Sequence, residues 1–119
     1  MIAGRVTEDD IPVIEVAVGD QQWQAIIDTG FNGALELPVR LRPQVNARPR
    51  GRVVSILAAN QQIEEDVFLV DFPFDGQTMR VEATFVESQQ ILIGMRLLRD
   101  YRITIDCPAR SVAIEKQGV

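Results

Sequence analysis

One carboxylate in this sequence has neighbours that fit it for chemistry. Asp28 follows the apolar pair Ile26-Ile27 and is followed at once by Thr29 and Gly30. A carboxylate at the end of an apolar strand is costly to desolvate unless it is hydrogen-bonded or shares a proton. Gly30 has no Cβ, so the backbone there can approach a ligand or a partner closely. These features predict a carboxyl group held at the floor of a cleft and available for acid–base chemistry.

Other catalytic machinery is excluded by the composition. The chain contains no His, which rules out Ser-His-Asp and Cys-His nucleophilic sites and imidazole-ligated metal sites. Its single Cys, Cys107, can form neither an internal disulfide nor a Cys-rich zinc site. We therefore expect no metal and no cofactor, and carboxylates remain the main chemical resource.

A second motif decides how the Asp-Thr-Gly triplet is interpreted, because the triplet alone also fits a hydrogen-bonded Asp at a strand end with no chemistry. Far downstream, Ile91-Leu92-Ile93-Gly94 runs into Met95-Arg96-Leu97-Leu98. Asp-Thr-Gly after two apolar residues, followed later by apolar-apolar-Gly and a short helical run, resembles the retropepsin-like aspartic proteases. Phe31 after the triplet resembles the bacterial single-domain branch of that family. The resemblance covers nearly the whole chain, from Ile11 to Glu115.

The resemblance implies an aspartic endopeptidase. Such an enzyme needs two carboxyl groups that share one proton over a water molecule: the ionised one takes a proton from the water, and the protonated one polarises the scissile carbonyl. This chain carries one Asp-Thr-Gly and no Asp-Ser-Gly. We therefore expect a homodimer, with Asp28 from each subunit meeting on a two-fold axis. The alternative is a retropepsin fold without turnover that serves as a module for peptide binding or dimerisation.

The same resemblance implies roles for individual residues. Asp28, Thr29 and Gly30 would form the catalytic loop, in which Thr29 hydrogen-bonds across the axis and Gly30 presents its carbonyl to the substrate. Gly94 would pack closely beneath this loop. An extended, apolar-rich peptide would lie between the loop and a mobile flap. Substrate binding is expected of Ile26, Phe31, Asn32, Leu35, Ala59, Asn60 and Leu92.

Short strands are expected to position these residues. Runs rich in β-branched residues, separated by turn signals, predict strands at 1–6, 11–18, 21–27, 34–37, 52–57, 63–70, 77–86, 91–93, 101–105 and 111–115. The first of them is expected at a sheet edge, and Trp23, Ala25 and Ile27 are expected to face the core. The segment 94–100 carries good helix formers, with Leu97 and Leu98 able to face the core.

This pattern predicts an all-β fold, specifically a closed β-barrel of the retropepsin-like type with one short helix near the C-terminus. A single domain would fill residues 1–119. The strands at 52–57 and 63–70 would form the flap, whose tip around Ala59 and Asn60 contains no Gly. Asn60 is a residue that tolerates a left-handed backbone in a turn.

The net charge and the hydropathy of the chain limit the classes of partner that we expect. The net charge of −5 argues against non-specific nucleic-acid binding. We interpret the alternating Arg48, Arg50 and Arg52 as a solvated loop in preference to a site for an acidic partner. No apolar run approaches the length of a membrane span, and residues 1–10 lack the basic and apolar regions of a signal peptide. We expect a cytoplasmic protein with no membrane partner.

Overall fold

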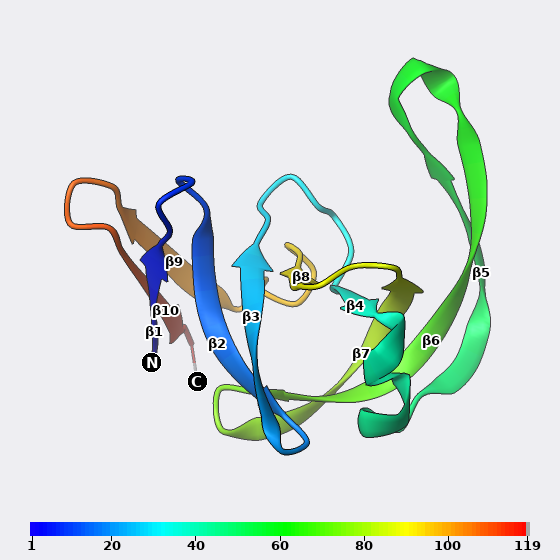
Figure 1. Ribbon diagram of the computed structural model, residues 1–119, viewed down its shortest axis with the longest axis horizontal. Coiled ribbons are helices and arrows are strands. Elements are labelled where there is room, and N and C mark those ends of the chain that lie inside the picture. The colour runs from blue at the N-terminus through cyan, green and yellow to red at the C-terminus, as the bar shows by residue number, and fades with distance from the viewer. Residues whose placement is uncertain (119) are drawn as a thin grey trace.

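The computed structural model describes residues 1–118, and β-strands dominate it (Figure 1). The strands form a 10-stranded sheet in the order β5-β6-β7-β4-β8-β3-β2-β1-β10-β9. Two short 3-10 helices, η1 (Val39–Gln44) and η2 (Ala58–Asn60), interrupt them. The strand bounds are β1 (Ile2–Val6), β2 (Pro12–Val18), β3 (Gln21–Ile27), β4 (Leu35–Pro38), β5 (Arg48–Ile56), β6 (Gln62–Phe74), β7 (Gln77–Val86), β8 (Ile91–Ile93), β9 (Tyr101–Asp106) and β10 (Ser111–Lys116).

The sheet is not closed into a barrel, which corrects that prediction. Strands β5 and β9 stand at its two ends, and within residues 1–118 neither has a partner on its outer side. Figure 1 shows the β9–β10 hairpin and β5 on opposite sides of the molecule. Closure does not occur because the last hairpin folds back onto β1 and does not reach β5.

Strand β1 is a central strand, whereas the sequence had predicted an edge strand. It pairs with β2 on one side, through Val6 and Pro12, and with β10 on the other, through Ile2 and Ile114. The Val6 N–H also donates to the Arg110 carbonyl at 3.0 Å, in the turn between β9 and β10. The C-terminal hairpin therefore covers the edge that β1 would otherwise expose.

The helix predicted over 94–100 is also absent, and residues 95–100 form turns. The N–H groups of Met95 and Arg96 donate to the carbonyls of Phe31 and Gly33, at 2.8 and 3.2 Å. At the other end the Tyr101 N–H donates to the Leu98 carbonyl at 2.9 Å, and β9 begins there. The short stretch between these two anchored ends favours tight turns over an α-helix. The core positions predicted for Leu97 and Leu98 are confirmed, since both are buried.

The core lies against one face of the neighbouring strands β3, β8 and β4. Residues alternate along these strands between buried and half-buried positions, as a strand with one face on a core requires. Trp23, Ala25 and Ile27 are buried, as predicted. The opposite face of the same strands is therefore free to carry a site.

Strand β5 begins at Arg48, earlier than the predicted start at residue 52. The prediction was late because Pro49 and Gly51 had indicated a loop. A register shift between these two residues accommodates them, and an edge strand tolerates Pro. The arginines thus lie on a strand and not in a loop, which corrects that interpretation. Arg48, Arg50 and Arg52 approach the carboxylates of Asp71, Glu82 and Asp66 at 3.8, 3.2 and 3.1 Å. Within residues 1–118, no helix is long and apolar enough to cross a bilayer.

Candidate active site

Asp28 lies directly after β3, where the chain leaves the sheet. Its N–H donates to the Ile93 carbonyl on β8 at 2.9 Å, so the strand pairing continues into the loop. Its Oδ1 accepts a hydrogen bond from the Gly30 N–H at 2.9 Å, and its carbonyl accepts one from the Phe31 N–H at 3.2 Å. The loop is therefore a tight turn that fixes the orientation of the carboxyl group.

The outer side of this loop is open. Asp28 is half-buried, whereas Thr29 and Gly30 are exposed. Among residues 1–118, the Thr29 hydroxyl has no hydrogen-bond partner and no second carboxyl group is hydrogen-bonded to Asp28. The chain thus presents the Asp28 carboxyl group at its surface, next to a free hydroxyl.

Gly94 packs directly beneath the loop, in agreement with the role that the resemblance implied. A Cβ added to it would lie 2.1 Å from the Gly33 carbonyl oxygen and 2.8 Å from that of Phe31. The Gly94 N–H donates to the Ala34 carbonyl at 3.0 Å. Only glycine fits at this position, so the Ile93-Gly94 segment supports the backbone of the Asp28 loop.

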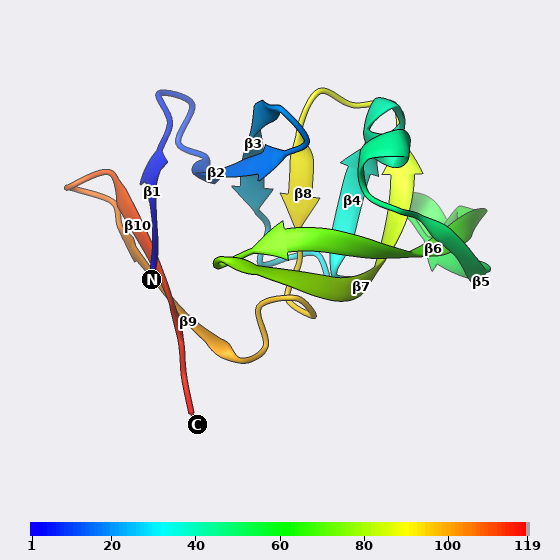
Figure 2. The same ribbon diagram turned by 90° about the horizontal axis from the view of Figure 1, so that it is seen from below.

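A row of side chains crosses the free face of the sheet beside Asp28. Figure 2 shows β3, β8 and β4 side by side. Ile26 on β3 pairs with Leu92 on β8, Leu92 pairs with Glu36 on β4, and Glu36 pairs with Thr84 on β7. All four are half-buried, and we call them the floor row. Asp28 follows Ile26 at the spacing of one strand face, so the carboxyl group belongs to the same side.

A cavity of about 680 Å³ lies between β4 and β7 and the hairpin of β5 and β6. Two members of the floor row, Glu36 and Thr84, line it, and so do the predicted substrate-binding residues Phe31, Asn32 and Leu35. Leu35 is only 1% exposed, however, and belongs to the core. The other lining residues are Gly33, Ala34, Val53, Val54, Ser55, Ile56, Leu57, Glu65, Val67, Glu82, Ala83 and Arg96.

The predicted residues Ile26 and Leu92 do not line this cavity but lie next to it in the floor row. Glu36 was not predicted. The alternation of Leu35-Glu36-Leu37 could have identified it, because two leucines on one face leave the Glu on the other.

The distal part of the β5–β6 hairpin, residues 51–66, forms the flap. It rises away from the rest of the sheet in Figure 1. At its tip Ala59 and Asn60 have φ values of 61° and 60°, so the left-handed backbone expected for Asn60 is confirmed and Ala59 shares it. Neither residue lines the cavity. Their part in substrate binding stays a prediction.

Glu36 is a titratable group of this cavity, and its surroundings shift its pKa. Burial raises the pKa of Glu36 above its usual range, and the negative charges of Glu65 and Asp28 raise it further. Within residues 1–118, Glu36 forms no ion pair and no side-chain hydrogen bond. No group of carboxylate and Cys side chains in the same range is arranged to hold a metal ion.

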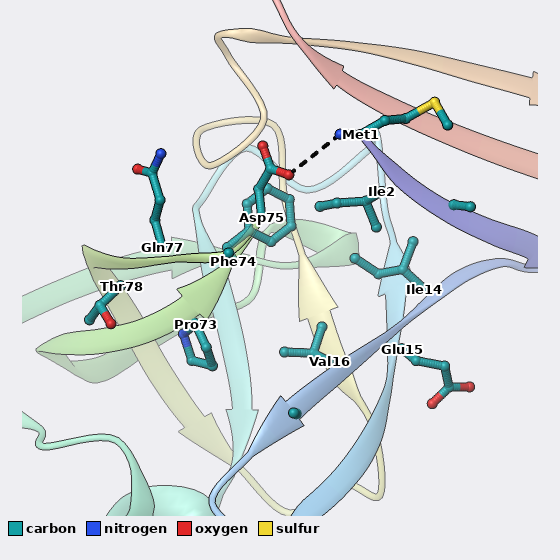
Figure 3. Close-up of a pocket in the computed structure, with 13 residues that line it drawn as sticks. Met1, Ile2, Ile14, Glu15, Val16, Pro73, Phe74, Asp75, Gln77 and Thr78 are labelled. Carbon is teal, nitrogen blue, oxygen red and sulfur yellow. Dashed lines mark ion pairs between the residues drawn. The ribbon is translucent and has the colours of Figure 1, made fainter.

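A second cavity, of about 600 Å³, opens on another part of the molecule, between β1, β2 and the β6–β7 turn (Figure 3). Apolar side chains such as Ile14, Val16 and Phe74 line it, and the Met1 amino group lies 3.8 Å from Asp75 Oδ1 at its edge. Neither the Asp28 loop (residues 28–30) nor the floor row contributes a residue to it. This cavity is therefore separate from the Asp28 loop and from the floor row.

No protein-family model matches the chain, and no curated protein matches it. Solved structures do match. A retropepsin-like aspartic protease from Rickettsia conorii aligns over 97% of this chain and 89% of its own, with 15% identity and a TM-score of 0.69. The simian foamy virus protease aligns over 73% and 91%, with 17% identity and a TM-score of 0.57.

The retroviral protease-like domain of Ddi1 from Leishmania major aligns over 91% of this chain and 94% of its own, with 10% identity and a TM-score of 0.52. These three proteins share their architecture with this chain at low sequence identity. The chain therefore has a retropepsin-like fold.

Proposed function

We propose that the protein is an aspartic endopeptidase that acts as a homodimer. The observation that supports this most strongly is the Asp28 loop, in which one carboxylate is fixed by the Gly30 N–H while the neighbouring Thr29 faces outward. Two-carboxylate chemistry needs a second acid, and the loop of an identical subunit would supply it. In the dimer, each Thr29 hydroxyl would hydrogen-bond to the partner loop.

The proposed mechanism shares one proton between the two Asp28 side chains. Like charges about 3 Å apart cannot both ionise, so one carboxyl group stays protonated. The ionised group accepts a proton from the water that attacks the peptide carbonyl, and the protonated group polarises that carbonyl. The proton then passes to the departing amine, and the carbon–nitrogen bond breaks.

The substrate of this enzyme would be an extended, apolar-rich peptide between the floor row and the flap. Main-chain groups of a strand-like peptide can hydrogen-bond to the Gly30 carbonyl, while apolar side chains pack on Ile26 and Leu92. Phe31 and Asn32 line the end of the cavity next to the catalytic loop. Ala59 and Asn60 would reach the peptide when the flap closes.

The second candidate function is a peptide-binding or dimerisation module without turnover. It is favoured by the position of the flap, which in this structure points away from the body and leaves the catalytic loop open (Figure 1). Such a module would use the cavity and need no second carboxylate.

Replacing Asp28 by Asn separates the two functions. The Asn Oδ1 can still accept the Gly30 N–H, but the ionisable acid is gone. An endopeptidase should lose about a hundred- to ten-thousand-fold in peptide hydrolysis, the usual contribution of general acid–base chemistry. Asp20→Asn, at the exposed β2–β3 turn, is the control and should cleave like the wild type.

Sedimentation of the wild type at micromolar concentration tests the dimer. Equal cleavage by the wild type and Asp28→Asn, or cleavage by a protein that sediments as a monomer, would contradict the proposal. Peptide binding by both forms with cleavage by neither would identify the silent module.

A further inference from the structure

The cavity under the flap contains a carboxylate that the proposed mechanism does not use. Glu36 lies in the floor row between Leu92 and Thr84, with its side chain half-buried. Its chain neighbours Leu35 and Leu37 are buried on the opposite face, which fixes Glu36 toward the cavity. Glu65, on the flap strand β6, lines the same cavity.

The acidic residues around the cavity differ in whether the chain neutralises them. Glu82 approaches Arg50 at 3.2 Å. On the flap, Arg52 lies 3.6 Å from Glu64 and 3.1 Å from Asp66. Glu36 and Glu65 have no such partner among residues 1–118.

One cationic side chain lines the cavity within the described part of the chain. This side chain is that of Arg96, in the turn after β8, whose backbone N–H donates to the Gly33 carbonyl at 3.2 Å. It approaches no carboxylate within ion-pair distance in residues 1–118. The cavity thus holds the two unpaired carboxylates of Glu36 and Glu65 against one guanidinium, and Glu36 is the one fixed in the rigid floor.

A half-buried carboxylate without a partner is unfavourable, and a second negative charge nearby makes it more so. Burial, the largest cause, and the negative charges of Glu65 and Asp28 raise the pKa of Glu36. A cation entering between floor and flap would offset these penalties, because it would pair with Glu36 and screen it from Glu65.

We propose that Glu36 is a specificity-determining residue that accepts the Lys or Arg side chain of a peptide substrate, with Glu65 contributing to the same cation from the flap. This inference rests on the proposed endopeptidase function and names its substrate class. The peptides are those in which a basic residue accompanies the apolar residue that packs on Ile26 and Leu92.

The position of the basic residue follows from the sheet. Glu36 on β4 is separated from β3, which Asp28 directly follows, by the single strand β8. Adjacent strands lie about 4.8 Å apart and an extended peptide advances about 3.3 Å per residue. A peptide that crosses these strands would place its basic side chain roughly two or three residues from the cleaved bond.

The test is a set of peptides that differ only at one of these positions, which holds Lys, Arg, Gln, Met or Glu. For the wild type, kcat/KM should be roughly ten- to a hundredfold higher with Lys or Arg than with Gln, the range of a charge-assisted hydrogen bond in a partly buried site. Glu36→Gln should reduce this ratio to about one, and Glu36→Lys should favour the Glu peptide. Glu64→Gln is the matched control: it lies beside Glu65, faces outward, and should leave the ratio unchanged.

A binding measurement separates failure of this inference from failure of the proposed function. Asp28→Asn protein and the same fluorescent peptides give dissociation constants without turnover, and the Lys peptide should again bind more tightly than the Gln peptide. Cleavage or binding without any preference for Lys or Arg overturns the inference and leaves the endopeptidase intact. A preference for the Glu peptide overturns the inference and indicates that Arg96 selects the substrate instead. If the peptides bind with the basic preference but the wild type cleaves none of them, the proposed endopeptidase function is wrong and the role of Glu36 stands. If the peptides are neither bound nor cleaved, both proposals are wrong.

Discussion

The floor and the flap are made of the same secondary structure and differ in what surrounds it. Floor strands β3, β8 and β4 each have a paired strand on both sides, and their inward side chains are buried. Flap strands pair only with each other beyond residue 51, and the flap leaves Val54 56% and Ile56 71% exposed. Apolar side chains held at such exposure lack an internal partner. The strands next to Asp28 are thus paired on both sides, whereas the flap keeps apolar surface exposed, and in the proposed enzyme a substrate would enter there.

The boundary between the two regions lies near Asp71 on β6. Its N–H donates to the Val45 carbonyl at 3.0 Å, and its Oδ2 accepts a hydrogen bond from Asn46 Nδ2 at 2.9 Å. Arg48 and Arg80 approach its Oδ1 at 3.8 and 3.5 Å. These contacts attach the base of the β5–β6 hairpin to the body, so motion of the flap is expected to begin beyond them.

Amide hydrogen exchange should show the largest difference between floor and flap. Backbone amides of β3 and β8, such as those of Ile27 and Ile93, should exchange only through global unfolding, which costs about 5–15 kcal/mol in proteins of ordinary stability. Amides of Val54 and Glu64 should exchange through local opening at a small fraction of that cost. NMR-detected exchange provides both values, and equal protection in the two regions would show that the flap is part of the cooperative core.

The same truncation should have opposite consequences in the two regions. Ile93→Ala, at a fully buried position on β8, should lower the free energy of unfolding by about 2–5 kcal/mol, because it leaves a cavity in the core. Ile56→Ala in the flap should change stability by no more than about 0.5 kcal/mol. It should instead weaken peptide binding, since Ile56 lines the cavity. Urea unfolding and peptide titration measure the two effects, and a large stability loss in Ile56→Ala would contradict the comparison.

Much of the floor could be predicted from the sequence. The bounds of β3, β7 and β8 agree with the prediction, because alternation and turn residues are local signals. The closed barrel and the edge position of β1 were predicted wrongly, since pairing between distant strands leaves no local trace in the sequence. The helix over 94–100 was wrong because hydrogen bonds to Phe31 and Gly33 outweighed intrinsic helix propensity.

The candidate site was predicted unevenly for a related reason. The Asp-Thr-Gly motif located the loop, because its residue types carry the chemistry themselves. Leu35 lines the cavity but is packed in the core, whereas the half-buried Glu36 beside it, which lines the same cavity, was not predicted. Which face of a short strand meets the core depends on the path of the preceding loop, and a shift of one residue exchanges the two faces.

Adding one methyl group beneath the Asp28 loop should cost almost as much stability as truncating a core side chain. Gly94→Ala would place its Cβ 2.1 Å from the Gly33 carbonyl oxygen, which cannot move without displacing the Asp28 loop. We expect a loss of about 3 kcal/mol in unfolding free energy, the upper part of the range for overpacking. In the flap, Ala59→Gly at φ 61° removes a methyl group from a left-handed residue and should change stability by less than about 1 kcal/mol. Urea unfolding of both variants is the measurement, and a neutral Gly94→Ala would contradict the close packing.

The smallest expected effect is found where floor and flap face each other. Burial raises the pKa of Glu36 in the folded protein above the value of 4.5 that applies to the unfolded chain. Between these two pKa values the folded state binds more protons than the unfolded state, so the free energy of unfolding falls as the pH rises through this window. Above the window Glu36 is ionised in both states, and the whole penalty remains at pH 7.

Glu36→Gln removes this penalty and should therefore stabilise the protein at pH 7 but not well below pH 4.5, where the native Glu36 is already neutral. Because solvent reaches the side chain, the gain should stay below about 1 kcal/mol. Urea unfolding of both proteins at pH 3 and pH 7 measures it, with Glu64→Gln as the control that should show no such pH dependence. A gain of equal size at both pH values would mean that side-chain packing, and not the charge of Glu36, accounts for the difference. Absence of any gain at pH 7 would mean that the carboxylate is already compensated, which would also remove the reason for a cation to bind there.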